Sequence, residues 1–149
     1  MYCSGFAQVE QNVEVVWDVF PDRGPLGGLH ACMKQIKTPY CLVLPVDVPQ
    51  IPVEVLSNLL EFHKKISEED MEKQVPVLLE HDERREYLIG IYPVEMVDAI
   101  EDLIRERSAP VHRLLTSWGF LCCKMEIAQW QVENINTQEA YQNLLEHED

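Results

Sequence analysis

Two aspartates flank a glycine-rich segment in the first third of the chain. Asp18 follows the β-branched run at residues 13–17, and Asp47 follows the apolar run at residues 40–46. Between them stands Gly24-Pro25-Leu26-Gly27-Gly28, a composition that predicts a tight loop leading into a helix. Glycines let the backbone approach a ligand closely, and a helix N-terminus offers unpaired N–H groups to an anion. Carboxylate oxygens beside such a loop suit Mg²⁺ and nucleotide phosphates, although either aspartate alone is also typical of a turn or a helix cap.

The elements that must position these residues alternate between strand and helix. Apolar and β-branched runs predict strands at residues 13–17, 40–46, 76–80, 87–92 and 120–127, with a turn at 81–85. Helical spacing predicts helices at residues 29–36, from about 53, and at 93–107, 110–118 and 137–145. The nearly continuous run at 40–46 is typical of a strand buried on both faces. We therefore expect an α/β layered sheet, in which ligands bind outside the carboxyl ends of the strands.

Length and charge narrow the classes of protein. The 149 residues suit a single domain, residues 1–149. Twelve Lys and Arg face 26 Asp and Glu, for a net charge of −14, so nucleic acid and anionic membrane are excluded as expected partners. The five cysteines lack C-x-x-C spacing, which argues against a zinc site. We see no signal peptide and no apolar stretch of membrane-spanning length, so we expect a cytoplasmic protein with reduced thiols.

Two motifs carry a resemblance to a known family. Residues 18–31 read D-V-F-P-D-R-G-P-L-G-G-L-H-A, and residues 43–52 read V-L-P-V-D-V-P-Q-I-P. Both closely resemble the MobA-like nucleotidyltransferases, the molybdenum cofactor guanylyltransferases. A late Asn134-Ile135-Asn136-Thr137 and weaker similarity extend the resemblance from about Val13 to the C-terminus. The implied fold is a Rossmann-like (GT-A-like) α/β layered sheet.

The resemblance also implies roles for single residues. Asp47 matches the catalytic carboxylate that ligates Mg²⁺, the expected cofactor, and touches the nucleotide. Asp18 matches a residue that contacts GTP, while Gly24, Pro25, Leu26, Gly27 and Gly28 match the loop that shapes the nucleotide pocket. Asn134 and Asn136 match positions facing the pterin, although N-x-N-T before a helix is equally a capping sequence. The implied reaction transfers GMP from GTP to molybdopterin and forms the guanine dinucleotide cofactor.

Three side chains outside these motifs carry weaker expectations. Arg107 and Arg113 could hold a substrate phosphate, or they could pair with neighbouring glutamates. His30, on the helix after the glycine-rich segment, is expected at the surface or the core edge and not in catalysis.

The chain departs from the family at its start. Family members begin with a strand and a loop of the form L-A-G-G-x-S-x-R-M-G-x-D-K, whereas residues 1–12 hold neither a glycine pair nor a Lys or Arg. We therefore expect an incomplete domain that lacks the first two β-α units, about 60 residues at about 30 each. The missing strand would leave an open apolar sheet edge for a protein partner or for self-association. Three alternatives stay open: an active enzyme, a cytidylyltransferase-type relative, and an inactive remnant or partner-binding subunit.

Overall fold

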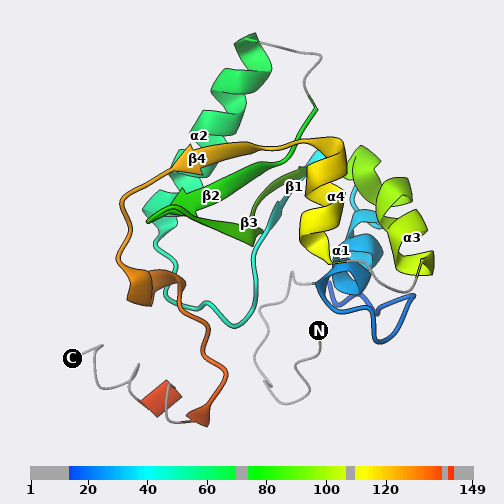
Figure 1. Ribbon diagram of the computed structural model, residues 1–149, viewed down its shortest axis with the longest axis horizontal. Helices are drawn as coiled ribbons and strands as arrows, with labels where there is room; N and C mark the ends of the chain where they lie inside the picture. Colours follow the sequence, from blue (N-terminus) through cyan, green and yellow to red (C-terminus); the bar gives the residue numbers. More distant parts are fainter. Residues whose placement is uncertain (1–13, 70–73, 107–109, 139–140, 143–149) are drawn as a thin grey trace. The chain divides into compact units, whose positions relative to one another are not determined.

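A computed structural model describes residues 14–69, 74–106, 110–138 and 141–142. It contains a four-stranded sheet in the order β1-β3-β2-β4, formed by Tyr40–Val43 (β1), Val77–His81 (β2), Arg84–Pro93 (β3) and Leu121–Lys124 (β4). The helices are Pro25–Met33 (α1), Val53–Glu69 (α2), Val97–Arg105 (α3) and Val111–Trp118 (α4), with 3-10 turns at Val94–Met96 (η1) and Gln129–Val132 (η2) (Figure 1). The expected α/β class is confirmed.

The chain divides into two compact units. One comprises Met1–Cys41 and Tyr92–Phe120, and the other comprises Leu42–Ile91 and Leu121–Asp149. The boundaries therefore fall inside β1 and β3 and directly before β4. We call them the helical unit, with α1, α3 and α4, and the sheet unit, with α2, β2, β4 and most of β3. The single domain over residues 1–149 stays a prediction.

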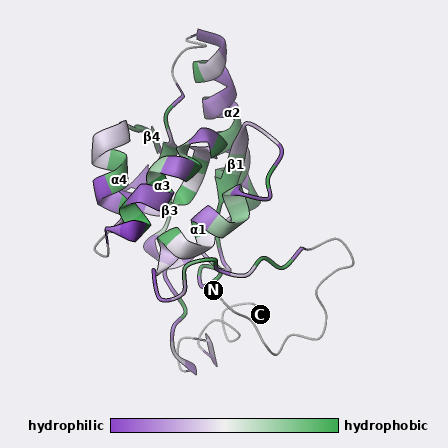
Figure 2. Ribbon diagram, turned by 90° about the vertical axis from the view of Figure 1, so that its right-hand side faces the viewer, coloured by the Kyte–Doolittle hydropathy of each residue, from purple (hydrophilic) through white to green (hydrophobic). Residues whose placement is uncertain are grey.

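The sheet unit is built around β2. This strand pairs with β3 in antiparallel and with β4 in parallel orientation. Val77, Leu78 and Leu79 are almost completely buried. Helix α2 contacts β2 and is amphipathic, with residues of both colours in Figure 2 and with Val55 and Leu59 buried. The strand that is buried on both faces is therefore the central strand β2.

The connection between β2 and β3 is shorter than expected. The predicted turn at 81–85 is confirmed in place but not in length, because His81 still belongs to β2 and Arg84 already belongs to β3. Only Asp82 and Glu83 form the turn, with φ of 45° and 61°. A two-residue turn with both φ positive matches the right-handed twist of the flanking strands, so polar residues can continue the ladder up to the turn.

The helical unit is packed through α3. Fourfold spacing of Met96, Ile100 and Ile104 predicts one apolar face for the helix at 93–107, and exposures of 0%, 0% and 2% confirm it. Helix α3 contacts both α1 and α4, and Figure 1 shows these three helices grouped together. The predicted helix at 110–118 is also confirmed, because α4 covers Val111–Trp118 and differs only by one residue at its start.

Two predicted strands differ in the structure. Residues 14–17 form no strand, and Val15 and Trp17 are 65% and 68% exposed, while Val13 lies outside the described residues. A β-branched run becomes a strand only beside a partner, and no described strand pairs with it. The run at 40–46 ends as a strand at Val43 and is not buried on both faces. Since β1 ends the sheet order, alternate residues stay in contact with solvent: Leu42, Leu44 and Val46 are 39%, 41% and 59% exposed.

The last predicted elements are shorter than expected or lie mostly outside the described residues. Strand β4 covers Leu121–Lys124 instead of residues 120–127. For the predicted helix at 137–145, the backbone N–H of Tyr141 donates to the Thr137 carbonyl at 3.1 Å, as in a helical turn. Helical spacing predicts Tyr141 on the inward face of this helix, but its side chain is 52% exposed, so that prediction is wrong. Within the part of the chain that the structure describes, no helix is both long and apolar enough to cross a membrane.

Candidate functional site

The glycine-rich segment is the first turn of α1 and not a loop. Gly24 is the N-cap, with φ +57°, and Pro25 occupies the first helical position. Proline is favoured there because its φ suits a helix and its missing N–H would have no helical partner anyway. Residues 25–28 therefore continue directly into the helix that was predicted to start at residue 29, and Leu26 lies in the core at 1% exposure.

The side chain of Asp18 lies against this first turn. A Cβ built on Gly27 would be 3.3 Å from Asp18 Oδ2 and 3.0 Å from the Phe20 carbonyl oxygen. A Cβ built on Gly28 would be 3.6 Å from Asp18 Oδ1. Two adjacent residues without side chains thus let the carboxylate approach the helix backbone. The structure brings the predicted Asp18 and the predicted Gly27-Gly28 together within the helical unit.

This placement changes what the helix N-terminus can hold. A carboxylate near the first turn is favoured by the positive end of the helix dipole. A phosphate placed at the same turn would meet the negative charge of Asp18. The ionised carboxylate accepts hydrogen bonds and donates none, so it suits a ligand group that presents N–H or O–H donors.

The second group of predicted residues lies in the sheet unit. Asp47 stands in a turn after β1 and is partly exposed. Its backbone carbonyl accepts a hydrogen bond from the Ile135 N–H at 2.7 Å. Asn134 and Asn136, on either side of Ile135, are exposed. One short backbone bond therefore brings together two motifs that lie far apart in the sequence, and it leaves both asparagine side chains accessible beside the Asp47 turn.

The described residues do not form a metal site made of protein ligands alone. Among them, no group of three or more His, Cys, Asp or Glu side chains is arranged to hold a metal ion. Mg²⁺ is commonly bound by one or two carboxylates together with substrate phosphates and water. The partly exposed Asp47 fits this second mode, in which the nucleotide supplies most of the ligands.

The two arginine candidates give different outcomes. Arg113 donates from Nη2 to Glu106 Oε2 at 3.1 Å, so the alternative of pairing with a neighbouring glutamate is confirmed for it. Arg107 lies outside the described residues.

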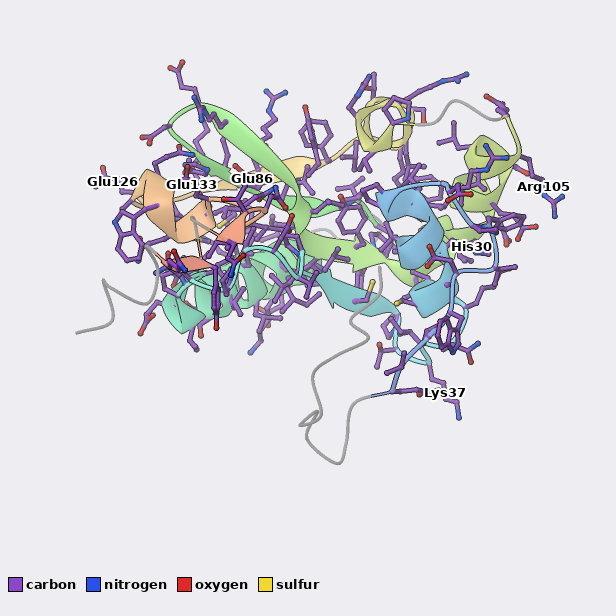
Figure 3. The ribbon with its side chains drawn as sticks, turned by 90° about the horizontal axis from the view of Figure 1, so that it is seen from below. His30, Lys37, Glu86, Arg105, Glu126 and Glu133 are labelled. Atoms are coloured by element: carbon purple, nitrogen blue, oxygen red, sulfur yellow. The ribbon has the colours of Figure 1, made fainter. Side chains whose placement is uncertain are left out.

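A cluster around the buried His30 was not predicted from the sequence. His30 is 2% exposed, and its Nε2 lies 3.1 Å from Glu101 Oε2 of α3. Glu101 also binds Arg105, whose guanidinium lies over the ring of Phe20 (Figure 3 labels His30 and Arg105). The expected position of His30 at the surface or core edge is therefore wrong. A signal existed in the chain, because His30 shares an apolar helix face with Leu26 and Met33 at helical spacing.

A solved structure shares this fold. The chain matches the molybdopterin-guanine dinucleotide biosynthesis protein A of Archaeoglobus fulgidus with a TM-score of 0.67 and 22% identity. The match covers 83% of this chain and 62% of that protein. At this identity the likeness shows the fold alone.

Sequence comparison identifies the family. A protein named "Probable molybdenum cofactor guanylyltransferase" from Clostridium perfringens is 30% identical over 146 residues, which cover 91% of this chain and 69% of that protein. The molybdenum cofactor guanylyltransferase of Pseudomonas fluorescens is 34% identical over 119 residues, covering 78% of this chain and 55% of its own length. The family model described as "MobA-like NTP transferase domain" matches residues 3–119. The chain therefore belongs to the MobA-like NTP transferase domain family.

Proposed function

We propose that this chain takes part in guanylyl transfer, in which GMP passes from GTP to molybdopterin. The terminal phosphate of the pterin attacks the α-phosphorus of GTP, the bond to the β-phosphate breaks, and pyrophosphate leaves. The observation that carries the proposal is the hydrogen bond between the Ile135 N–H and the Asp47 carbonyl at 2.7 Å. This bond between the segments that carry Asp47 and the two asparagines supports a shared site, and the names of the relatives support the same substrates.

The proposed role of Asp47 is to orient the nucleotide phosphates. Mg²⁺, when bound, supplies positive charge that neutralises the transferring phosphoryl group. The Asp47 carboxylate would hold the ion, while the amides of Asn134 and Asn136 would offer donors and acceptors to the pterin. In a chain of net charge −14, such local neutralisation is needed before two anionic substrates can approach each other.

The proposed role of Asp18 is to bind a part of the nucleotide other than its phosphates. Its carboxylate lies against Gly27 and Gly28, and a carboxylate offers hydrogen-bond acceptors only. The donors of a guanine base or of ribose hydroxyls fit this acceptor, whereas phosphate oxygens do not. The resemblance implies that Asp18 contacts GTP, and the position of its carboxylate beside the first turn of α1 supports a contact with the donor groups of the nucleoside.

Calorimetric titration of GTP in the presence of Mg²⁺ tests the proposal. We expect micromolar binding by the wild-type chain, a loss of roughly tenfold or more in Asp47→Ala, and no change in Glu61→Ala. Glu61 is a matched control because it is an exposed carboxylate of α2 in the same unit, and its removal changes the net charge equally. Titration with CTP separates guanylyl from cytidylyl transfer. Equal GTP affinity in wild type and Asp47→Ala would contradict the role of Asp47.

A partner-binding role is the second candidate, and exposed apolar side chains on and after β1 favour it. Leu42 lies on β1, the strand that ends the sheet order, Leu44 and Val46 follow directly after the strand, and all three are exposed. We propose that a basic polypeptide segment adds to this strand. Main-chain pairing at a sheet edge supplies affinity, and the net charge of −14 favours a cationic partner over a second copy of this chain.

Sedimentation and peptide binding test this second candidate. We expect the chain to remain monomeric and to bind an alternating Val-Lys peptide, but not the matching Val-Glu peptide. Leu44→Gln should weaken the binding of the Val-Lys peptide, while Leu60→Gln, at an exposed leucine of α2, should not. A concentration-dependent dimer that Leu44→Gln abolishes would instead identify a second copy as the occupant.

A further inference from the structure

We propose that His30, Glu101 and Arg105, together with the ring of Phe20, are positioning residues that hold Asp18 against the first turn of α1. The inference rests on the proposed function only in the experiments that measure GTP binding. All four residues belong to the helical unit. Phe20 and His30 fall within the motif at residues 18–31, whereas Glu101 and Arg105 lie outside both motifs that carry the resemblance.

The four side chains form a closed ring of contacts. His30 Nε2 lies 3.1 Å from Glu101 Oε2, and Arg105 donates to Glu101 Oε1 at 2.6 Å from Nη2 and 3.2 Å from Nε. The Arg105 guanidinium lies 5.4 Å from the centre of the Phe20 ring. That ring in turn meets the His30 ring edge-on, at 5.2 Å and 62°. Each residue thus contacts two others, so removing one opens the ring at two points.

The ring connects α1 and α3 to the segment that carries Asp18. Phe20 follows Asp18 by two residues, and its carbonyl oxygen would lie 3.0 Å from a Cβ on Gly27. The segment is therefore fixed twice: its backbone lies against the first turn of α1, and its aromatic ring lies between His30 of α1 and Arg105 of α3. Sliding of this segment along the helix would break the ring contacts first.

The hydrogen-bonding chemistry indicates that His30 does more than fill space. The pKa of Glu101 is lowered to about 2, first by the hydrogen bond from Arg105 and then by that from His30, so the carboxylate is ionised and acts as an acceptor. His30 must then carry its proton on Nε2. Its Nδ1 is buried without a partner among the described residues. A leucine would fill similar volume without an unpaired nitrogen, so the Nε2 donor is the feature that distinguishes histidine at this position.

Two substitutions at His30 separate packing from positioning. In His30→Gln the side-chain amide can place a donor near the Nε2 position, whereas His30→Leu fills the space without any donor. Amide spectra and hydrogen exchange of Gly27 and Gly28 report the first turn of α1 directly, without any ligand. We expect His30→Leu to shift these two signals and to weaken GTP binding roughly three- to tenfold, with His30→Gln close to wild type.

A surface pair of variants keeps the test valid if His30→Leu fails to fold. The Arg105 side chain is 63% exposed, so Arg105→Gln opens the ring without disturbing the core, and it should shift the same two glycine signals. Lys34→Gln is the matched control, because Lys34 Nζ lies 3.5 Å from Glu101 Oε2 but has no part in the ring around Phe20. It should leave Gly27 and Gly28 unchanged.

The outcomes distinguish this inference from the proposed function. Unchanged glycine signals in both His30→Leu and Arg105→Gln would overturn the positioning role, as would a His30→Gln variant that is damaged as much as His30→Leu. If the glycine signals shift in His30→Leu and Arg105→Gln but the wild-type chain does not bind GTP, the nucleotide proposal is overturned. The positioning role then still stands.

Discussion

Gly90 is the position where one added methyl group should do the most damage. It pairs with Leu78 in the ladder between β2 and β3, next to the bulge that separates the Leu78 and Leu79 pairs. A Cβ on Gly90 would lie 2.4 Å from the Val77 carbonyl oxygen and 3.2 Å from the Leu78 Cα. Both obstacles are backbone atoms, so a rotamer change cannot relieve them. Gly90→Ala must displace β3 from the most buried strand of the sheet unit.

The expected loss of stability follows from three terms. Overpacking of a well-packed core costs about 1–3 kcal/mol. Strand displacement also weakens one or two ladder hydrogen bonds, each contributing about 0.5–1.5 kcal/mol. The reduced freedom of alanine in the unfolded chain offsets about 0.4–1 kcal/mol. We therefore expect Gly90→Ala to lower the free energy of unfolding by about 2–4 kcal/mol.

Urea denaturation followed by circular dichroism measures this loss, and Gly28→Ala is the control. A Cβ on Gly28 would meet Asp18 Oδ1 at 3.6 Å, an ordinary contact. Because alanine favours helices over glycine, Gly28→Ala should be neutral or stabilising by up to about 1 kcal/mol. If Gly90→Ala lost less than about 1 kcal/mol, or if both variants lost the same amount, the steric reasoning would be refuted.

Three further predictions concern charge, backbone and thiols. Hydrogen bonds from Arg105 and His30 lower the pKa of Glu101 from 4.5 to about 2 in the folded chain. The ionised carboxylate therefore contributes its full share of folding stability above about pH 4.5, and this share is lost as the pH falls toward 2. Acid unfolding of Glu101→Gln, compared with wild type, should lack this part of the pH dependence. Glu83→Gly should stabilise the β2–β3 hairpin by about 1 kcal/mol in urea titrations, because Glu83 has φ +61°; an unchanged midpoint would contradict this. With iodoacetamide near pH 8, mass spectrometry should find the exposed Cys32 labelled before Cys41, because burial raises the pKa of Cys41 to about 11. Burial also raises the pKa of Cys123, so this thiol should react late as well. Labelling of Cys41 before Cys32 would contradict the prediction.

The spacing of apolar residues was sufficient to predict the helices that bury only one face. Helical spacing predicted both α3, with Met96, Ile100 and Ile104 on one face, and α4. The segment at 14–17 shows the limit of this reasoning. Its β-branched residues allow a strand, but pairing depends on a neighbour that the local sequence does not reveal. The exposed Leu42 and Leu44 show the same limit, because an apolar run does not say which strands flank it.

The candidate site was predictable in its residues more than in its geometry. Motif resemblance selected Asp18, Asp47 and the two asparagines, but their roles stay predictions. The hydrogen bond that joins Ile135 to Asp47 links backbone atoms, and backbone contacts between distant segments leave no trace in residue types. His30 was misplaced for a related reason: an ionisable residue suggests solvent, unless its partner on α3 is known.

The parallel pairing of β2 with β4 has a consequence for the order of folding. The β2–β3 hairpin needs only a two-residue turn, so it can form early from neighbouring residues. Pairing of Val77 with Leu121 must wait until β3, α3 and α4 have been made, because all of them lie between the two strands in the chain. During synthesis, the second edge of β2 therefore stays uncovered until its last neighbour emerges. A nascent chain that ends before Leu121 should be the species most in need of a chaperone.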